Sequence, residues 1–357
     1  MAAMALNAAF WAGRRVLLTG HTGFKGSWLA LWLTLLGAEV QGYALPAVPG
    51  PSLWRAARLD ELVPGTEADI RDSQEISRAV QSFQPDIVLH LAAQALVRAS
   101  YQAPADTYAV NVMGTLHLLE AVRRCEAVRA VVVVTSDKCY SNREWQWPYR
   151  EQDALGGHDP YSSSKACVEL LCESWRASFL QSGNARLATA RAGNVIGGGD
   201  ISPDRLVPDA LRAWERSDTL SLRYPQATRP WQHVLEPLHG YLLLAQALVE
   251  RKGEAAAAWN FGPEADGVAS VADVVDQLVS LWPGTAAWRC DASDELHEAG
   301  LLALDSSKAR HLLNWRPRWT LRQALTRTIE WHSASRSGAD MQAFTRNQIA
   351  AFQENVA

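Results

Sequence analysis

The chain has no apolar run that could cross a membrane and no excess of positive charge. A transmembrane helix needs about 18 or more consecutive apolar residues, and no segment of the 357 residues approaches that length. Lysine and arginine total 34 against 38 acidic residues, a net charge of -4, so the basic surface of a nucleic-acid-binding protein is missing. These absences favour a soluble protein with a small-molecule partner, and neither a membrane nor a nucleic acid is expected to bind.

Cysteine patterns typical of metal sites are also missing. None of the cysteines forms a C-x-x-C pair or a Cys/His cluster with metal-ligand spacing. We therefore expect no metal site, and reduced thiols in a cytoplasmic protein. Residues 1–12 are apolar but lack the basic start and long hydrophobic core of a signal peptide, so a disordered leader is expected.

The first half of the chain alternates strand patterns with helix patterns. Repeated strand-helix units with nearly continuous apolar strands predict an α/β fold, a Rossmann-type doubly wound parallel sheet with helices on both faces. The expected strands are 15–19, 39–44, 65–68, 87–91, 130–135 and 187–191, and the clearest helices are 73–84, 107–125 and 161–181.

After about residue 192 the pattern becomes irregular, with several prolines and shorter helices expected at 235–250 and 271–282. We expect residues 13–191 to form a dinucleotide-binding Rossmann domain and 192–357 to form mainly a smaller, mixed substrate-binding lobe. The segment 230–262 is expected to return to the first domain. No repeat or low-complexity linker separates the two parts.

A glycine turn joins the first strand to the first helix. Gly20, Gly23 and Gly26 have the spacing G-x-x-G-x-x-G, which lets backbone approach a pyrophosphate while the helix N-terminus supplies amide donors. The spacing alone also fits a plain tight turn, but a strand before it and a helix after it favour a dinucleotide site. The expected cofactor contacts in this turn are Gly20, His21, Gly23, Phe24, Lys25 and Gly26.

The second strand leaves the choice between NAD and NADP open. Residues 42–46 contain neither an acidic residue for the adenine ribose nor an arginine for a 2′-phosphate. Asp69 and Ile70 are candidates for contacts with the adenine, although Asp69 fits a helix cap equally well. Small residues follow the fourth strand, where backbone must pass close to a cofactor, and the candidates there are Leu91, Ala92 and Ala93.

Tyr161 and Lys165 stand four residues apart at the start of a predicted helix. Asp159 suits the cap, Pro160 suits the first helical position, and the i,i+4 spacing places Tyr161 and Lys165 on one face. A phenol titrates near ~10, and an adjacent ammonium would lower that pKa and make Tyr161 a usable base. Taken alone, the same spacing also fits a stacked surface pair.

Together these motifs resemble the extended short-chain dehydrogenase/reductase superfamily, and within it the nucleotide-sugar 4,6-dehydratases. The stretches 19–28, 135–140, 142–145 and 156–161 look most like the branch that acts on CDP-D-glucose, and the likeness covers almost the whole chain. The resemblance implies an NAD-dependent lyase that converts CDP-glucose to CDP-4-keto-6-deoxyglucose with loss of water. It also implies deoxysugar biosynthesis, such as that of lipopolysaccharide O-antigen, by a homodimer or homotetramer.

The resemblance implies a role for each catalytic residue, in a cycle that moves hydride from C4 to NAD and back to C6. Tyr161, tuned by Lys165, removes the proton of the C4 hydroxyl, and Ser136 hydrogen-bonds the same oxygen. Lys165 also holds the nicotinamide ribose. Asp137 protonates the departing C6 hydroxyl. Lys138 stands where dTDP-glucose relatives carry a glutamate as the C5 base, so either Lys138 acts as that base, or it pairs with a carboxylate and water is the base.

Substrate contacts are expected in the second part of the chain. Asn194, Arg205 and Arg229 match the family's positions for binding a nucleoside diphosphate, and the arginine fork suits phosphate oxygens. The alternative for both arginines is a solvated loop charge. Trp145 follows the catalytic strand and is expected to close over the sugar.

Other functions are possible on this fold. A sugar-nucleotide 4-epimerase or a simple dehydrogenase would need Tyr161 but has no use for an acid such as Asp137 near C6. A regulatory NAD-binding protein would not need Ser136, Tyr161 and Lys165 together. The complete set therefore favours the elimination of water.

Overall fold

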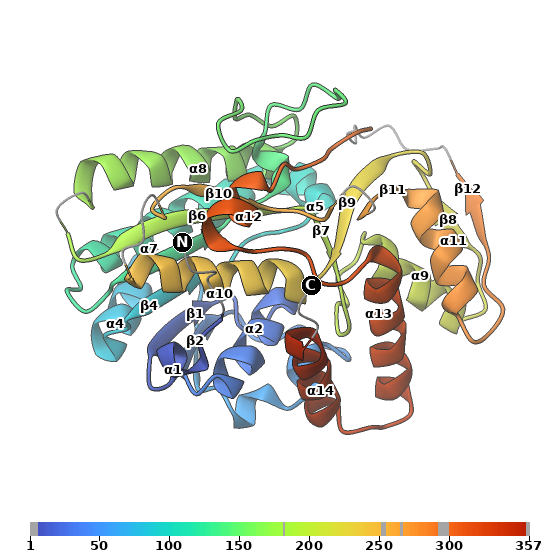
Figure 1. Ribbon diagram of the computed structural model, residues 1–357, viewed down its shortest axis with the longest axis horizontal. Coiled ribbons are helices and arrows are strands. Elements are labelled where there is room, and N and C mark those ends of the chain that lie inside the picture. The colour runs from blue at the N-terminus through green and yellow to red at the C-terminus, as the bar shows by residue number, and fades with distance from the viewer. Residues whose placement is uncertain (1–5, 181–182, 251–254, 265–266, 292–299, 355–357) are drawn as a thin grey trace.

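A computed structural model describes residues 6–180, 183–250, 255–264, 267–291 and 300–354. The chain forms a large lobe built on a seven-stranded sheet, with a smaller lobe beside it (Figure 1). Among the described residues, no helix is long and apolar enough to cross a membrane.

The large sheet has the strand order β10-β6-β5-β4-β1-β2-β3, and every neighbouring pair is parallel. This is the doubly wound Rossmann arrangement predicted from the sequence. The chain order reverses between β1 and β4, and ligands of such sheets bind at that point, beyond the carboxyl ends of the strands. The strands are β1 (Arg15–Thr19), β2 (Glu39–Ala44), β3 (Gly65–Glu67), β4 (Ile87–His90), β5 (Ala130–Val134), β6 (Arg186–Ala192) and β10 (Ala258–Phe261).

Both faces of the sheet are buried, because alternate side chains of each strand enter different apolar clusters. In β1, Val16 and Leu18 belong to one cluster while Leu17 belongs to the other. In β5, Val132 belongs to the first of these clusters and Val131 to the second. This burial on two sides explains why the strands read as continuous apolar runs.

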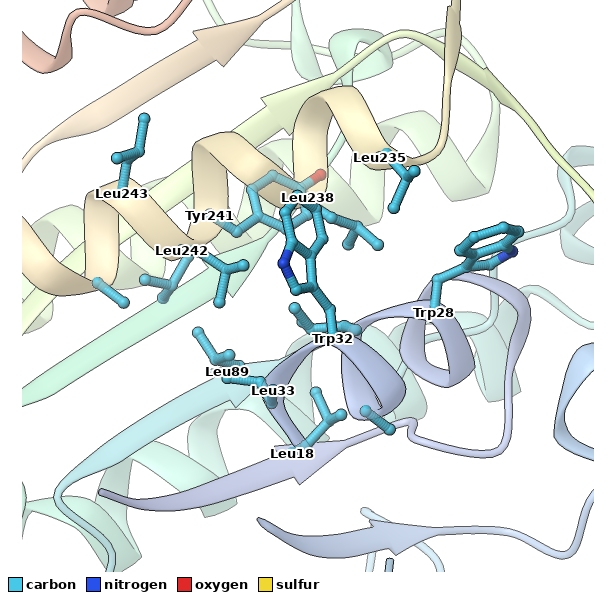
Figure 2. Close-up of a cluster of buried hydrophobic side chains, with 14 of the residues drawn as sticks. Leu18, Trp28, Trp32, Leu33, Leu89, Leu235, Leu238, Tyr241, Leu242 and Leu243 are labelled. Carbon is cyan, nitrogen blue, oxygen red and sulfur yellow. The ribbon is translucent and has the colours of Figure 1, made fainter. Parts of the chain in front are cut away.

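Helices cover each face of the sheet. Helix α10 (Leu235–Val249) is buried along nearly its whole length, which is why its sequence is apolar on all sides. Figure 2 shows side chains of α2 and α10, among them Trp32 and Tyr241, in one cluster with Leu18 and Leu89 of the strands. One face is covered by α2 (Phe24–Leu35) and α10 (Leu235–Val249), the other by α4 (Ser73–Phe83), α7 (Gly114–Arg123) and α8 (Pro160–Phe179).

The smaller lobe has its own core, built from short strands and three helices. A three-stranded sheet has the order β11-β9-β7, and β12 pairs with β8. The elements are β7 (Asn194–Ile196), α9 (Leu206–Glu215), β8 (Leu220–Leu222), β9 (Thr228–His233), β11 (Val268–Ser270), α11 (Val271–Leu281), β12 (Trp288–Cys290) and α13 (Leu321–Arg336).

Two expectations for local structure are corrected. Residues 6–12 are not a disordered leader, because α1 (Ala8–Trp11) forms and Trp11 is fully buried in the core; residues 1–5 lie outside the described residues. The single helix expected over 107–125 is divided into α6 (Pro104–Tyr108), a π-helical segment η2 (Ala109–Met113) and α7. The remaining elements are α3 (Leu53–Ala56), η1 (Leu59–Glu61), α5 (Val97–Gln102), η3 (Asp137–Cys139), α12 (Ser307–Leu313) and α14 (Met341–Glu354).

Candidate active site

A cleft of about 810 Å³ opens at the carboxyl ends of the central strands, lined by residues of both lobes. It brings together residues from the glycine turn, the segment after β5, the start of α8 and the smaller lobe. The residues expected from the sequence that line it are Lys25, Ser136, Asp137, Lys138, Tyr161, Asn194, Arg205 and Arg229.

The start of α8 fixes Tyr161 and Lys165. The Asp159 side chain accepts a hydrogen bond of 2.9 Å from the Ser162 amide, and Pro160 occupies the first turn, so the predicted cap is confirmed. Tyr161 and Lys165 are both buried. The Lys165 Nζ donates to the Val134 carbonyl at 3.2 Å, which ties α8 to the end of β5.

The turn after β5 presents Ser136 and Asp137. The Ser136 hydroxyl accepts a hydrogen bond from the Lys138 amide at 3.2 Å and donates one to Asp137 Oδ1 at 3.0 Å, and it lies close enough to the Tyr161 phenol to lower its pKa. Asp137 is buried, and its Oδ2 has no hydrogen-bond partner among the described residues. A hydroxyl, a phenol and a carboxyl with one unused oxygen therefore meet at one end of the cleft.

The pKa of Tyr161 differs from the expectation. Burial raises it to about 12, against the lowering effect of the Ser136 hydrogen bond and the Arg205 charge. The prediction that the pKa of Tyr161 lies below its ordinary value is wrong for this structure, because burial outweighs the groups that favour the phenolate. Tyr161 is therefore a neutral phenol in the protein as described here.

Burial also sets the protonation of the carboxyl group. It raises the pKa of Asp137 above its ordinary value, although Lys138, the Ser136 hydrogen bond and Arg229 act in the opposite direction. A carboxyl group that keeps its proton can act as a general acid.

Two buried lysines, Lys165 and Lys25, lie near Ser136, Asp137 and Tyr161. Burial lowers the pKa of Lys165 to about 8 and that of Lys25 to about 7, where the nearby Arg205 charge adds to the effect. The Lys25 Nζ lies 6.0 Å from the centre of the Tyr241 ring. The amine of Lys25 can therefore exchange a proton near neutral pH.

The glycine turn forms a close cradle with the segment after β4. Gly20 has a φ of +76°, and a Cβ there would lie 2.8 Å from the Ala92 amide nitrogen. A Cβ at Gly26 would lie 2.0 Å from the Gly20 carbonyl oxygen. The Thr19 hydroxyl accepts hydrogen bonds from the Leu91 and Ala92 amides at 3.2 and 3.1 Å. This close backbone, followed by the N-terminus of α2, fits the pyrophosphate of a dinucleotide.

His21 lies in the turn, but its imidazole packs away from the cleft. The ring makes an edge contact with Trp54, their centres 4.8 Å apart, and a Cβ at Gly42 or Gly65 would approach it within 2.4 or 2.5 Å. Burial lowers the pKa of His21 to about 4. The neutral ring therefore fills the space beside β2 and β3, and only its backbone belongs to the cradle.

The two candidates after β3 have clear packing roles. Asp69 pairs with Arg71 at 2.6 Å, which lowers the pKa of its carboxyl group. It does not cap α4, because Asp72 accepts the amide hydrogen bonds at that helix start, so the capping alternative for Asp69 is wrong. Ile70 is buried against Gly114. A contact of either residue with the adenine stays a prediction.

The π-helical segment η2 supports the cleft from behind. The buried Asn111 side chain accepts a hydrogen bond from the Gln94 amide at 2.8 Å and donates to the Gln94 carbonyl at 3.0 Å. Its amide also donates to the Ser164 hydroxyl at 2.9 Å. Asn111 therefore fixes the backbone after β4 to α8, the helix that carries Tyr161.

Residues of the smaller lobe bring further charge to the cleft. Arg229 is buried on β9 and donates to the Thr228 carbonyl at 2.9 Å. Arg205 pairs with Asp200 at 3.3 Å. Asp200 also lines the cleft and was not anticipated; its place after three consecutive glycines was the available signal.

Other placements differ from the sequence analysis. Trp145 stacks on Tyr149 with 5.3 Å between ring centres and is not among the described residues that line the cleft, so its contact with a sugar stays a prediction. Arg98 and Tyr224 do line the cleft. No motif singled them out, since a lone arginine or tyrosine carries no local pattern.

Comparisons with known proteins agree with this geometry. A curated CDP-glucose 4,6-dehydratase of Salmonella typhimurium is 49% identical over 346 residues, covering 96% of each chain. Among solved structures, a UDP-glucose-4-epimerase of Stenotrophomonas maltophila with bound NAD has a TM-score of 0.78 at 22% identity, covering 91% of this chain and 100% of that one. A dTDP-glucose 4,6-dehydratase of Bacillus anthracis in complex with NAD has a TM-score of 0.75 at 18% identity, covering 92% and 100%.

The two structural likenesses show that the fold is shared, and the sequence matches identify the family. Residues 17–328 match the family described as GDP-mannose 4,6 dehydratase. The chain therefore belongs to this family of nucleotide-sugar 4,6-dehydratases, within the extended short-chain dehydrogenase/reductases.

Proposed function

We propose that this protein is an NAD-dependent CDP-glucose 4,6-dehydratase, which converts CDP-glucose to CDP-4-keto-6-deoxyglucose and water. The observation that carries the proposal is the buried Asp137 carboxyl group with an unused oxygen beside Ser136 and Tyr161. A redox enzyme that only oxidises or epimerises C4 has no use for that acid. The 49% identity to a CDP-glucose 4,6-dehydratase supports the same substrate.

The cradle of Gly20, Gly23 and Gly26 with the segment 91–93 would hold the pyrophosphate of NAD, and Lys165 would hold the nicotinamide ribose. Bound NAD would supply the chemistry the side chains lack, by accepting hydride from C4 and returning it to C6. We assign this role to residues 13–191 together with the returning strand β10, and substrate binding mainly to 192–357.

In the first half of the reaction, the phenol of Tyr161 first releases its own proton to water, and the resulting phenolate accepts the proton of the C4 hydroxyl as C4 becomes a ketone. Ser136 donates a hydrogen bond to the same oxygen. Although burial holds the phenol neutral, the Ser136 hydrogen bond and the Arg205 charge both favour the phenolate. These two groups therefore help Tyr161 to act as a base.

In the second half, the 4-ketone acidifies the C5 proton, and Lys138 or a water molecule removes it. Asp137 donates its proton to the C6 hydroxyl, which leaves as water. The raised pKa of Asp137 favours this role, because it shifts the carboxyl group toward its protonated form. The electrons of the C5–H bond form the C5–C6 double bond, to which hydride is later added at C6 and a proton at C5.

The diphosphate of the substrate would lie against Arg205 and Arg229, with Asn194 as a further polar contact. Both guanidinium groups border the cleft that contains Asp137, and paired N–H donors suit phosphate oxygens. Arg205 and Arg229 interact with any nucleoside diphosphate, so they leave the choice of base to other residues.

The test is an incubation of the purified protein with NAD and CDP-glucose, followed by mass spectrometry of the sugar nucleotide. A product lighter by one water, with no net accumulation of reduced cofactor, is expected. Parallel reactions with dTDP-glucose and GDP-mannose measure the choice of base and sugar. Equal turnover of all three would contradict the assignment to CDP-glucose, and a product of unchanged mass would indicate an epimerase.

We also propose that the enzyme is a cytoplasmic homodimer or homotetramer that uses exposed surface of α8 and the neighbouring η2. Three large apolar side chains are exposed on α8 and the neighbouring η2: Met113 at 44%, Leu170 at 55% and Phe179 at 46%. Contact with a second copy would remove them from water. Sedimentation of the wild type and of Leu170→Glu tests this, and a wild type that sediments as a monomer would overturn it.

A further inference from the structure

A buried ion pair lies directly behind the catalytic turn, and the reaction described above does not use it. Glu169 of α8 and Arg191 of β6 approach within 2.8 Å, with side-chain exposures of only 2% and 3%. Burying two charges is costly and seldom adds net stability. Stability alone therefore does not account for this pair.

The Glu169 carboxylate connects the helix of Tyr161 to the strands below it. Its Oε1 accepts a hydrogen bond of 2.5 Å from the Thr135 hydroxyl, and its Oε2 accepts one of 2.7 Å from the Thr189 hydroxyl. Thr135 immediately precedes Ser136, whose hydroxyl contacts both Tyr161 and Asp137. The carboxylate thus restrains the residue from which the catalytic turn begins.

Glu169 also follows Lys165 by one helical turn, so the two side chains lie on the same face of α8. Its negative charge is the largest influence that keeps Lys165 protonated against burial. The other titratable groups that face Lys165 are Cys172 on the same helix, Cys139 from η3, His90 from β4 and Lys25 from α2.

Burial favours the neutral form of these neighbours. It raises the thiol pKa values of Cys139 and Cys172 and lowers the pKa of His90 to about 3. Lys25, when charged, acts against Lys165. The negative charge that Lys165 experiences therefore comes from Glu169.

Arg191 extends the network toward the loop that follows the catalytic turn. One Nη donates to the Tyr140 hydroxyl at 2.7 Å and to the Glu151 carbonyl at 3.1 Å. The Tyr140 hydroxyl donates to Asn260 of β10 at 2.8 Å, and Asn260 donates to the Tyr149 carbonyl at 2.9 Å. The pair therefore joins β5, β6, β10, α8 and the loop that carries Trp145.

We propose that Glu169 and Arg191 are positioning residues for the C4 oxidation. They hold Thr135, and through it Ser136, in place relative to Tyr161. They also keep an anion beside Lys165. The inference rests on the proposed dehydratase function and deepens it. Neither residue is among those that line the cleft, so each acts through its neighbours.

The first test uses two matched substitutions. Thr135→Val and Thr189→Val each remove one hydroxyl that donates to Glu169, but only Thr135 adjoins the catalytic turn. The rate of C4 oxidation is measured in single turnovers from the absorbance of reduced nicotinamide, below the melting temperature of each variant. We expect Thr135→Val to lose about tenfold in rate or more, with Thr189→Val near the wild type. Equal losses in the two variants would overturn the proposal.

The second test removes both charges, since Glu169→Gln alone would leave Arg191 buried without a partner. In Glu169→Gln/Arg191→Met, Lys165 loses its anion and should lose its proton at lower pH. We expect the alkaline limb of the oxidation rate to move down by about one pH unit, and NAD affinity, measured by fluorescence titration, to fall over the same range. An unchanged alkaline limb in a folded variant would contradict the role.

The wild type separates the two proposals. If it does not dehydrate CDP-glucose, the proposed function fails, while the NAD titrations still test the anion beside Lys165. If the wild type is active but the pH profiles coincide, the positioning role fails and the function stands.

Discussion

At the scale of single residues, burial acts in the same direction on the two acid-base groups of the cleft. It raises the pKa of the Tyr161 phenol and of the Asp137 carboxyl group, so both favour their neutral forms. The consequences differ, because the proposed reaction asks Tyr161 to accept a proton and Asp137 to give one. Burial therefore favours the proton-donating role of Asp137 and opposes the proton-accepting role of Tyr161, which depends on its neighbours.

Tyr161→Phe should abolish the oxidation of C4. The substitution removes the only atom proposed to accept the C4 proton, and loss of a general base commonly costs about 10²–10⁴ in rate. The measurement is the rate at which reduced nicotinamide forms in a single turnover. Tyr241→Phe is the matched control, since the Tyr241 hydroxyl is also buried but has no hydrogen-bond partner among the described residues. Similar losses in both variants would exclude a special role for Tyr161.

Asp137→Asn should spare the oxidation and stall the loss of water. Reduced nicotinamide should then accumulate, since the amide cannot protonate the leaving hydroxyl. In the wild type, elimination should slow as pH rises through the raised pKa of Asp137, and the variant should lose that dependence. If Asp137→Asn instead blocks formation of reduced nicotinamide, the division of roles between Asp137 and Tyr161 is incorrect.

At the scale of elements, Gly26 of the glycine turn has no room for a side chain. We expect Gly26→Ala to lower the free energy of unfolding by about 1–3 kcal/mol and to weaken NAD binding, because the new Cβ would lie 2.0 Å from the Gly20 carbonyl. Gly23→Ala is the control, since its Cβ would lie 3.3 Å from the same atom and its φ of -79° suits alanine. Thermal unfolding compares the two variants, and equal losses of stability would argue against the steric explanation; NAD titration of Gly26→Ala measures the loss of binding.

The attachment of the segment before α13 to α10 should depend on pH. The buried Glu236 side chain accepts hydrogen bonds from the Arg318 and Trp319 amides at 3.0 and 2.8 Å, and burial raises its pKa to about 8. A carboxyl group whose pKa rises on folding stabilises the protein fully below its unfolded pKa, and this contribution is lost as pH rises through the folded value.

Stability should therefore decline between about pH 4.5 and pH 8 through this group. In Glu236→Gln, the melting temperature should decline less over that range than in the wild type. Glu330→Gln serves as the control, because Glu330 is a half-exposed partner of Arg327 and such pairs contribute little. Identical pH dependence in the wild type and Glu236→Gln would contradict the raised pKa.

At the scale of the whole molecule, the parallel sheet could be predicted because each strand is marked by a short apolar run in the sequence. Apolar strands such as β1 and β5 are buried on both faces, and their bounds agree with the expectation to within a residue. The helix cap before Tyr161 and the glycine spacing around Gly26 could also be recognised from neighbouring residues alone. The π-helical break at Asn111 carried no such signal, because it is stabilised by Gln94 and Ser164, which are distant in sequence.

The site was predictable as a set of residues but not as an electrostatic environment. The spacing of Tyr161 and Lys165 places both on α8, yet the pKa of Tyr161 depends on its burial and on groups from other elements, such as Ser136 and Arg205. His21 belongs to the predicted turn, but its ring packs against Gly42 and Gly65. The pKa of Tyr161 and the position of the His21 ring depend on contacts between residues far apart in the sequence, which the spacing of residues along the chain does not reveal.

In the proposed reaction, hydride that leaves C4 for the bound cofactor would return to C6 of the same sugar. The most direct measurement is turnover of CDP-glucose deuterated at C4, mixed with unlabelled substrate of distinguishable mass. We expect deuterium at C6 of the product, with no exchange of label between molecules. Deuterium that remains at C4, or that appears in free reduced cofactor, would contradict the account.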